Sequence, residues 1–185
     1  VIKNMAVKIN YKNISFKKIS HNLVLFTDDK FNLNPLKKYI SKAEYFYVND
    51  LLKTNDLKKN LLIFELNSKK KIFLVSIKKN ITTSDVESLG AEFYKKVNYG
   101  KNSEYFIISE SFSVKLKNFI GYFLNGLKLK SYEFKKYKTK KETRDILINI
   151  SGNKNKPSVQ NQLKFKALEE GTFYARDLVS EPGNV

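Results

Sequence analysis

The chain has 185 residues, of which 42% are hydrophobic and 14% aromatic, so it can bury a core and disorder is not expected. It has no cysteine, no signal-peptide block and no apolar run near the roughly 18 residues of a membrane span, which together favour the cytoplasm and exclude disulfide and thiolate metal sites. The net charge of +17 suggests nucleic-acid binding. However, Arg144 and Arg176 are the only arginines, and lysine lacks the forked guanidinium with which proteins typically bind phosphates and base edges.

Six short runs predict strands, because they are apolar or alternate with period two. In chain order they are Met5–Tyr11, Leu23–Thr27, Leu61–Leu66, Ile72–Ile77, Tyr105–Ser109 and Asp145–Ile150. A polar connection of hairpin length, residues 67–71, joins the third and fourth runs. The hairpin predicts one antiparallel pair, so we expect a mixed sheet.

Two helices are expected between the later strands. Ser84 and Glu87 have the spacing of a capping box, and the apolar residues behind them fall on one helical face. A second helix is expected from near Ser113, with its buried stripe at Leu116, Phe119, Ile120, Phe123, Leu124 and Leu127. Strands that alternate with helices predict a layered α/β domain over residues 1–150, with helices on both faces of the sheet.

The character of the chain changes after residue 150. Residues 151–160 are polar and rich in helix breakers, so we expect a linker there. Residues 161–185 predict a C-terminal linker helix that ends near Pro182, with an apolar stripe at Leu168, Gly171, Ala175, Leu178 and Val179. A helix in this position is typical of a connector to a further domain.

The last sixteen residues, 170–185, resemble the beginning of the catalytic domain of leucyl (cytosol) aminopeptidases. The resemblance rests on a Gly, an Ala-Arg-Asp-Leu run, a Pro and an Asn at the family's spacing, which here are Gly171, Ala175, Arg176, Asp177, Leu178, Pro182 and Asn184. Ser180 and Gly183 depart from the commoner Asn and Ala. A weaker resemblance covers Gly126-Leu127, Tyr132-Glu133-Phe134 and Tyr137-Lys138.

This resemblance implies an N-terminal, non-catalytic α/β domain with a three-layer, macro-domain-like fold. In the family, a helix joins that domain to a C-terminal exopeptidase domain, and the enzymes are homo-hexamers that release N-terminal amino acids from peptides. Two divalent metal ions, manganese or zinc, polarise the scissile carbonyl and supply the hydroxide. The family's metal-binding and catalytic residues lie further along the chain, so we expect no catalytic residue and no metal here, and an inactive fragment.

Other candidate sites have ordinary structural explanations. His21 is the only histidine and is expected at the surface, while Asp28-Asp29 suits a turn and Glu169-Glu170 diverge on a helix. No phosphate-binding glycine motif occurs, which weakens a nucleotide-binding interpretation.

A basic and aromatic run is the best nucleic-acid candidate. Its cations would be Lys128, Lys130, Lys135, Lys136 and Lys138, interleaved with Tyr132, Phe134 and Tyr137. The alternative is that the aromatic rings pack onto the domain while the lysines extend into solvent. The family pattern favours this alternative, so nucleic acid is the less favoured partner. For Arg176 and Asp177 we expect a role in anchoring the helix against the following domain.

Overall fold

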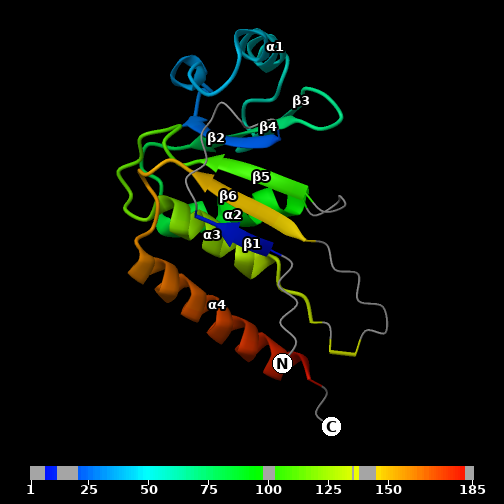
Figure 1. The fold of residues 1–185 in the computed structure, drawn as a ribbon, viewed down its shortest axis with the longest axis vertical. Coiled ribbons are helices and arrows are strands. Elements are labelled where there is room, and N and C mark those ends of the chain that lie inside the picture. Colours follow the sequence, from blue (N-terminus) through cyan, green and yellow to red (C-terminus); the bar gives the residue numbers. More distant parts are fainter. Residues whose placement is uncertain (1–6, 12–20, 98–102, 135, 138–144, 182–185) are drawn as a thin grey trace.

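The computed structural model describes residues 7–11, 21–97, 103–134, 136–137 and 145–181. These residues form a six-stranded sheet in the order β1-β6-β5-β2-β4-β3 (Figure 1). The strands are β1 (Val7–Asn10), β2 (Asn22–Asp28), β3 (Leu61–Glu65), β4 (Lys71–Ile77), β5 (Ser103–Ile108) and β6 (Ile146–Ser151). Strand β3 is antiparallel to β4, and the other pairs are parallel. The predicted mixed sheet and its hairpin are confirmed.

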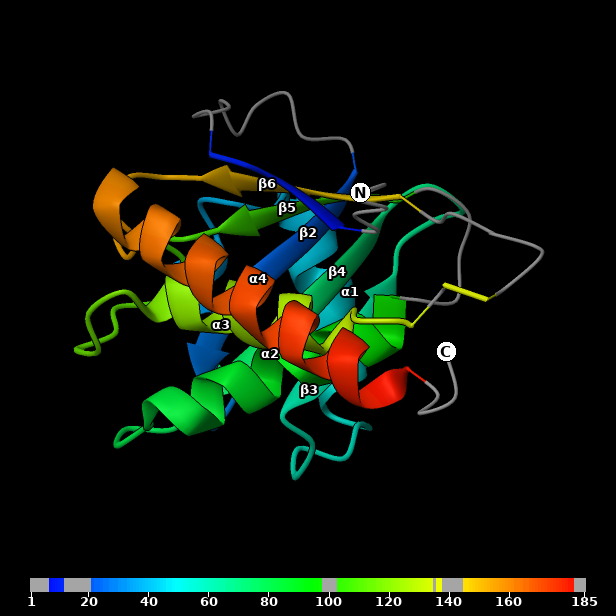
Figure 2. The same ribbon diagram turned by 90° about the horizontal axis from the view of Figure 1, so that it is seen from below.

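Alternate residues of the central strands build a separate apolar core on each face of the sheet. Val24 and Phe26 of β2 pack with α2 (Thr83–Val97) and α3 (Phe119–Lys130). Leu23 and Leu25 pack on the other face, with α1 (Lys42–Leu52) and the preceding segment 31–40. The described residues therefore form the expected three-layer α/β fold, with helices on both faces (Figures 1 and 2).

Helix α4 (Val159–Ser180) lies outside these three layers. It packs on α3, on the side of α3 away from the sheet (Figures 1 and 2). Ser158 caps its first turn by accepting a hydrogen bond from the Asn161 amide. Although α4 has 22 residues, none of them is buried. The predicted division of the chain into a domain, a linker and a connecting helix stays a prediction.

The structure differs from the sequence analysis at three helices. Helix α2 is capped by Thr82, whose hydroxyl accepts a hydrogen bond from the Asp85 amide, so the predicted cap at Ser84 lies inside the helix. Helix α3 begins at Phe119 rather than near Ser113, because Asn118 has a left-handed backbone with φ of 58°. Helix α1 was not expected, although Ser41 and Glu44 form a complete capping box.

Candidate interaction surface on helix α4

On its inner face, the first half of α4 contacts α3 through an aromatic ring and an ion pair. Phe165 lies over Gly121, where an added Cβ would come within 2.3 Å of the ring, and Tyr122 contacts the same ring edge-on at 5.2 Å. One turn further on, the Lys128 amine lies 3.1 Å from the Glu169 carboxylate, and these side chains are only 10% and 14% exposed. Because the Glu169 carboxylate is nearly desolvated, it depends on the Lys128 amine to compensate its charge.

Two residues of the aminopeptidase-like motif also bind inward. Arg176 donates a hydrogen bond to the Leu129 carbonyl at 2.7 Å, and its guanidinium lies 5.5 Å from the centre of the Tyr132 ring. Asp177 accepts a hydrogen bond from the Tyr132 hydroxyl at 2.8 Å. The two motif residues that we expected to face a further domain therefore contact α3 and the residues that follow it.

The outer face of α4 is mostly apolar and is uncovered in the described structure. Leu178 is 55% exposed and Val179 is 87% exposed. We define the outer face by its exposed apolar and small residues, among which the exposed Lys164 also lies: Leu163, Ala167, Leu168, Gly171, Tyr174, Ala175, Leu178 and Val179. Large apolar side chains that gather on one face in this way are typical of an interaction surface.

Gly171 lies within this outer face and has no local structural reason to be glycine. An added Cβ would meet nothing within 4 Å, and the residue lies in the interior of α4. Glycine in the middle of a helix costs about 0.5–1 kcal/mol relative to alanine. A close approach by another chain segment, which only glycine permits, would explain the residue.

The remaining motif residues divide between the outer face and the undescribed end of the chain. Ala175 and Leu178 are exposed beside Gly171. Pro182 and Asn184 lie outside the described residues. The motif thus presents small and apolar residues outward, and its charged pair inward.

The predicted basic patch does not form a set of free cations where the structure describes it. Lys128 is paired with Glu169, and Lys136 forms an ion pair with Glu181, while Lys130 is exposed. Lys135 and Lys138 lie outside the described residues. The centres of the Tyr132 and Phe173 rings are 5.2 Å apart, so the Tyr132 ring packs against α4 and is not free to stack on a base.

The other sequence candidates are structural where they are described. Asp28 accepts hydrogen bonds from the amides of Lys30 and Asn32, as a turn residue does. The His21 ring lies 3.9 Å from the Glu104 carboxylate at the surface. Among the described residues, no group of three or more His, Cys, Asp or Glu side chains could hold a metal ion. Nor is any helix of that part of the chain long and apolar enough to cross a membrane.

At the carboxyl edge of the sheet, where open α/β sheets usually bind ligands, the loops after β5 and β6 are hydrogen-bonded to each other. After β5, the Glu110 carboxylate accepts hydrogen bonds from the amides of Asn153 and Lys154, at 2.6 and 3.1 Å. Asn155 donates to the carbonyls of Ser109 and Phe112. The Glu110 carboxylate therefore takes the place that a phosphate would need at these two amides.

The hydrogen bonds of Glu110 predict a pH dependence of stability. The amides of Asn153 and Lys154 lower the pKa of Glu110 from its ordinary value of 4.5. A lowered pKa means that the ionised carboxylate stabilises the fold at pH values above the unfolded-state pKa. This stabilisation is lost as the pH falls through the pKa of the folded state. We expect Glu110→Gln to lose about 1 kcal/mol at neutral pH and to show a smaller further loss between pH 5 and 3.

Urea unfolding at several pH values measures this effect. Glu92→Gln, which removes a carboxylate from α2, is the control. Equal pH profiles for Glu110→Gln and the wild type would show that the Glu110 carboxylate does not hold this loop.

Comparisons with known proteins assign the fold. The sequence matches no family model and no curated protein. Its three-layer α/β fold is shared with a leucine aminopeptidase and with the bottromycin maturation enzyme BotP. A mutant of tomato leucine aminopeptidase superposes with a TM-score of 0.65 at 14% identity, over 96% of this chain and 39% of that one. The bottromycin maturation enzyme BotP in complex with Mn superposes with a TM-score of 0.60 at 10% identity, over 89% of this chain and 32% of that one. A second BotP structure superposes with a TM-score of 0.59.

These matches show a shared fold, and this chain spans less than two-fifths of the length of each neighbour. Since 96% of the chain is covered by the tomato enzyme, most of α4 belongs to the matched region. Helix α4 is therefore part of the shared architecture.

Proposed function

We propose that this chain is the N-terminal, non-catalytic domain of a leucyl-aminopeptidase-type enzyme, and that the outer face of α4 is the surface on which the following domain packs. The fold and the motif at residues 170–185 support this assignment from independent directions. The observation that carries it is the outward orientation of Gly171, Ala175 and Leu178, motif residues that the described domain does not use.

The arrangement of α4 suits a helix between two domains. Its inner face is attached by the Phe165 contact, the Lys128–Glu169 ion pair and the hydrogen bonds of Arg176 and Asp177. Its outer face exposes apolar side chains whose removal from water would contribute about 25 cal/mol per Å² of buried area. Attachment on one face and an uncovered apolar surface on the other would let α4 hold a second domain at a fixed angle.

The chemistry of the parent enzyme belongs to this proposal. Two divalent ions, manganese or zinc, would activate water for the release of N-terminal amino acids from peptides. The residues that would hold them lie outside the described part of the chain, which offers no fitting cluster. One of the structural neighbours is a complex with Mn. A homo-hexamer and a cytoplasmic location complete the proposed parent enzyme.

An activity comparison tests the assignment. We expect the full-length product of the gene to hydrolyse leucine p-nitroanilide when Mn²⁺ or Zn²⁺ is added. The 185-residue chain, shown by circular dichroism to be folded, should release no p-nitroaniline under the same conditions. Activity of the short chain alone, or a full-length product that is inactive with both metals, would overturn the proposal.

A further inference from the structure

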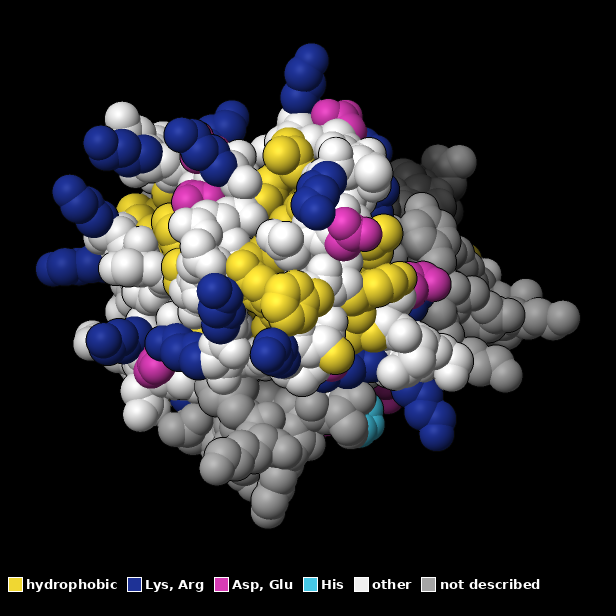
Figure 3. Space-filling view, turned by 90° about the horizontal axis from the view of Figure 1, so that it is seen from above, with side chains coloured by type: hydrophobic (Ala, Val, Ile, Leu, Met, Phe, Trp, Pro, Cys, Tyr) yellow, Lys and Arg dark blue, Asp and Glu magenta, His cyan; other side chains and the backbone are white. Residues whose placement is uncertain are grey.

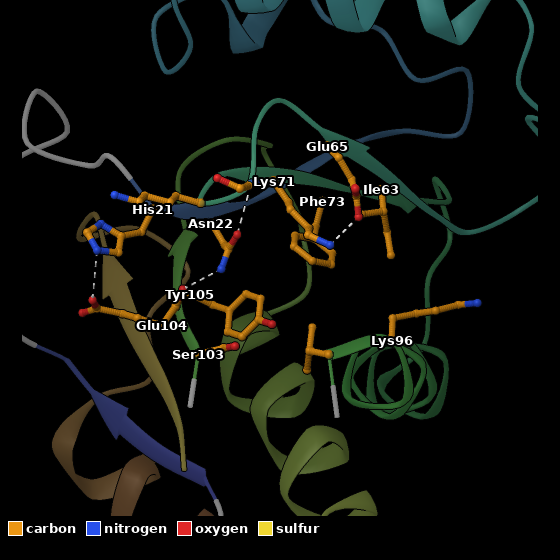
Figure 4. Close-up of a pocket in the computed structure, with 13 residues that line it drawn as sticks. His21, Asn22, Ile63, Glu65, Lys71, Phe73, Lys96, Ser103, Glu104 and Tyr105 are labelled. Carbon is orange, nitrogen blue, oxygen red and sulfur yellow. Dashed lines mark hydrogen bonds and ion pairs between the residues drawn. The ribbon is translucent and has the colours of Figure 1, made fainter. Parts of the chain in front are cut away.

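The amino edge of the sheet is hollowed, but the residues there hold the sheet itself together. Asn22 of β2 donates a hydrogen bond to the Glu104 carbonyl of β5 and accepts one from the Lys71 amide of β4 (Figure 4). Phe73 and Tyr105, which also border this hollow, belong to the core. The amino edge therefore has a structural explanation, whereas helix α1, on the face of the sheet away from α4, has an exposed surface that lacks one.

Helix α1 exposes two neighbouring aromatic side chains. Phe46 is 57% exposed and Tyr47 is 47% exposed. Val48, the one buried residue of α1, lies about 200° around the helix from Phe46. Phe46 therefore points away from the core and into solvent. Figure 3 looks down on this side of the molecule and shows apolar side chains gathered near its centre, with lysines around them.

The charges on the same side of α1 are arranged symmetrically about Phe46. Lys42 lies four residues before Phe46 and Asp50 four residues after it, and both are exposed. Because residues four apart are neighbours on a helix surface, these three side chains form one continuous row, which we call the α1 ridge. If a second copy of the ridge crossed the first in the opposite direction, each Lys42 would face the Asp50 of the other copy. The ridge is thus complementary to itself, as a two-fold contact requires.

The remaining charges of α1 are compatible with this pairing. Glu44, its other acid, is paired with Lys70 at 2.6 Å, and these side chains are only 20% and 15% exposed. Asp50 contacts Lys53 at 3.0 Å, but both side chains are largely exposed, so the Asp50 carboxylate can accept a second cation. Ridges of residues four apart also interdigitate in the commonest class of helix packing.

We propose that the α1 ridge is a two-fold contact between two copies of this chain, with Phe46 against its counterpart and a Lys42–Asp50 ion pair on each side. One helix from each copy buries less surface than the roughly 1,200–2,000 Å² of a stable interface, so the isolated chains form a weak, reversible dimer. The net charge of +17 on each copy opposes their approach, and salt screens this repulsion. Since α1 and α4 lie on opposite faces of the sheet, the contact does not depend on the function proposed for α4.

Sedimentation equilibrium of the 185-residue chain, in about 0.15 M salt, tests the proposal. We expect the weight-average mass to rise above that of the monomer as the protein concentration increases. Lys42→Glu and Asp50→Lys should each weaken self-association about tenfold, because each variant replaces two ion pairs by two contacts between like charges. An equimolar mixture of these two variants should associate far more strongly than either alone, since both contacts in the mixed dimer again join opposite charges.

Two control variants separate this contact from other causes of association. Lys95→Glu changes the net charge as Lys42→Glu does, but it lies on α2 and should alter self-association by less than about twofold. Leu178→Ala reduces the outer face of α4 and should also leave the dimer intact. Circular dichroism checks that each variant is folded.

Four results would overturn the proposal. The first is a wild-type chain that stays monomeric at every concentration. The second is equal weakening by Lys42→Glu and Lys95→Glu, which would reduce the effect to net charge. The third is a mixture of Lys42→Glu and Asp50→Lys that associates no better than its components. The fourth is loss of the dimer in Leu178→Ala, which would place the contact on α4.

Discussion

Replacing Gly126 by alanine is expected to lower the free energy of unfolding by about 3 kcal/mol. Helices α2 and α3 cross so closely that a Cβ on Gly126 would lie 1.9 Å from the Glu87 carbonyl oxygen. A Cβ on Gly90 would likewise lie 1.9 Å from the Phe123 carbonyl oxygen. Because these obstacles are backbone atoms, no side-chain rotation can relieve the clash, and the helices must separate and loosen the core between them.

Urea unfolding measures this loss, and Gly171→Ala is its control. Both variants add one methyl group to a helical glycine, but the space at Gly171 is open. Gly171→Ala should therefore stabilise the isolated chain by about 0.5–1 kcal/mol. A loss below about 1 kcal/mol for Gly126→Ala would contradict the close crossing of α2 and α3.

Replacing Lys128 by methionine is expected to cost about 2–3 kcal/mol and to loosen α4. The change removes the cation that faces Glu169, whose side chain is 14% exposed, and leaves that carboxylate without its partner. Since α4 has no buried residue, this ion pair is a major part of its attachment to α3. We expect hydrogen exchange of α4 amides to accelerate more than that of the sheet.

A double variant separates the ion pair from simple packing. Lys128→Met/Glu169→Leu removes both charges, so no unpaired carboxylate remains, and at least half of the lost stability should return. If the double variant is as unstable as Lys128→Met alone, the interaction of the charges does not cause the loss. If Lys128→Met costs less than about 0.5 kcal/mol, the pair does not hold α4.

The central strands β2 and β4 could be predicted because they are continuous apolar runs, buried on both faces of the sheet. Helix α1 could not be found from an apolar stripe, because Val48 is its one buried residue. Its capping box at Ser41 and Glu44 was the available signal. The early start expected for α3 came from Leu116, which continues the helical spacing although the backbone turns at Asn118.

The candidate surface was only partly predictable, since sequence spacing does not reveal which face of α4 meets the domain. The predicted apolar stripe, with Leu168, Gly171 and Leu178, points away from the described domain. The actual attachment uses long-range pairs, such as Lys128 with Glu169, that no local pattern reveals.

Thiol labelling would test most directly whether the outer face of α4 is an interdomain surface. The chain has no cysteine, so Leu178→Cys and Leu57→Cys each introduce one reporter into it, at leucines that are 55% and 44% exposed. Both thiols should react readily with iodoacetamide in the 185-residue chain. In the full-length gene product, followed by peptide mass spectrometry, we predict slow labelling at position 178 and unchanged labelling at position 57. Equally fast labelling at position 178 in both proteins would contradict the account.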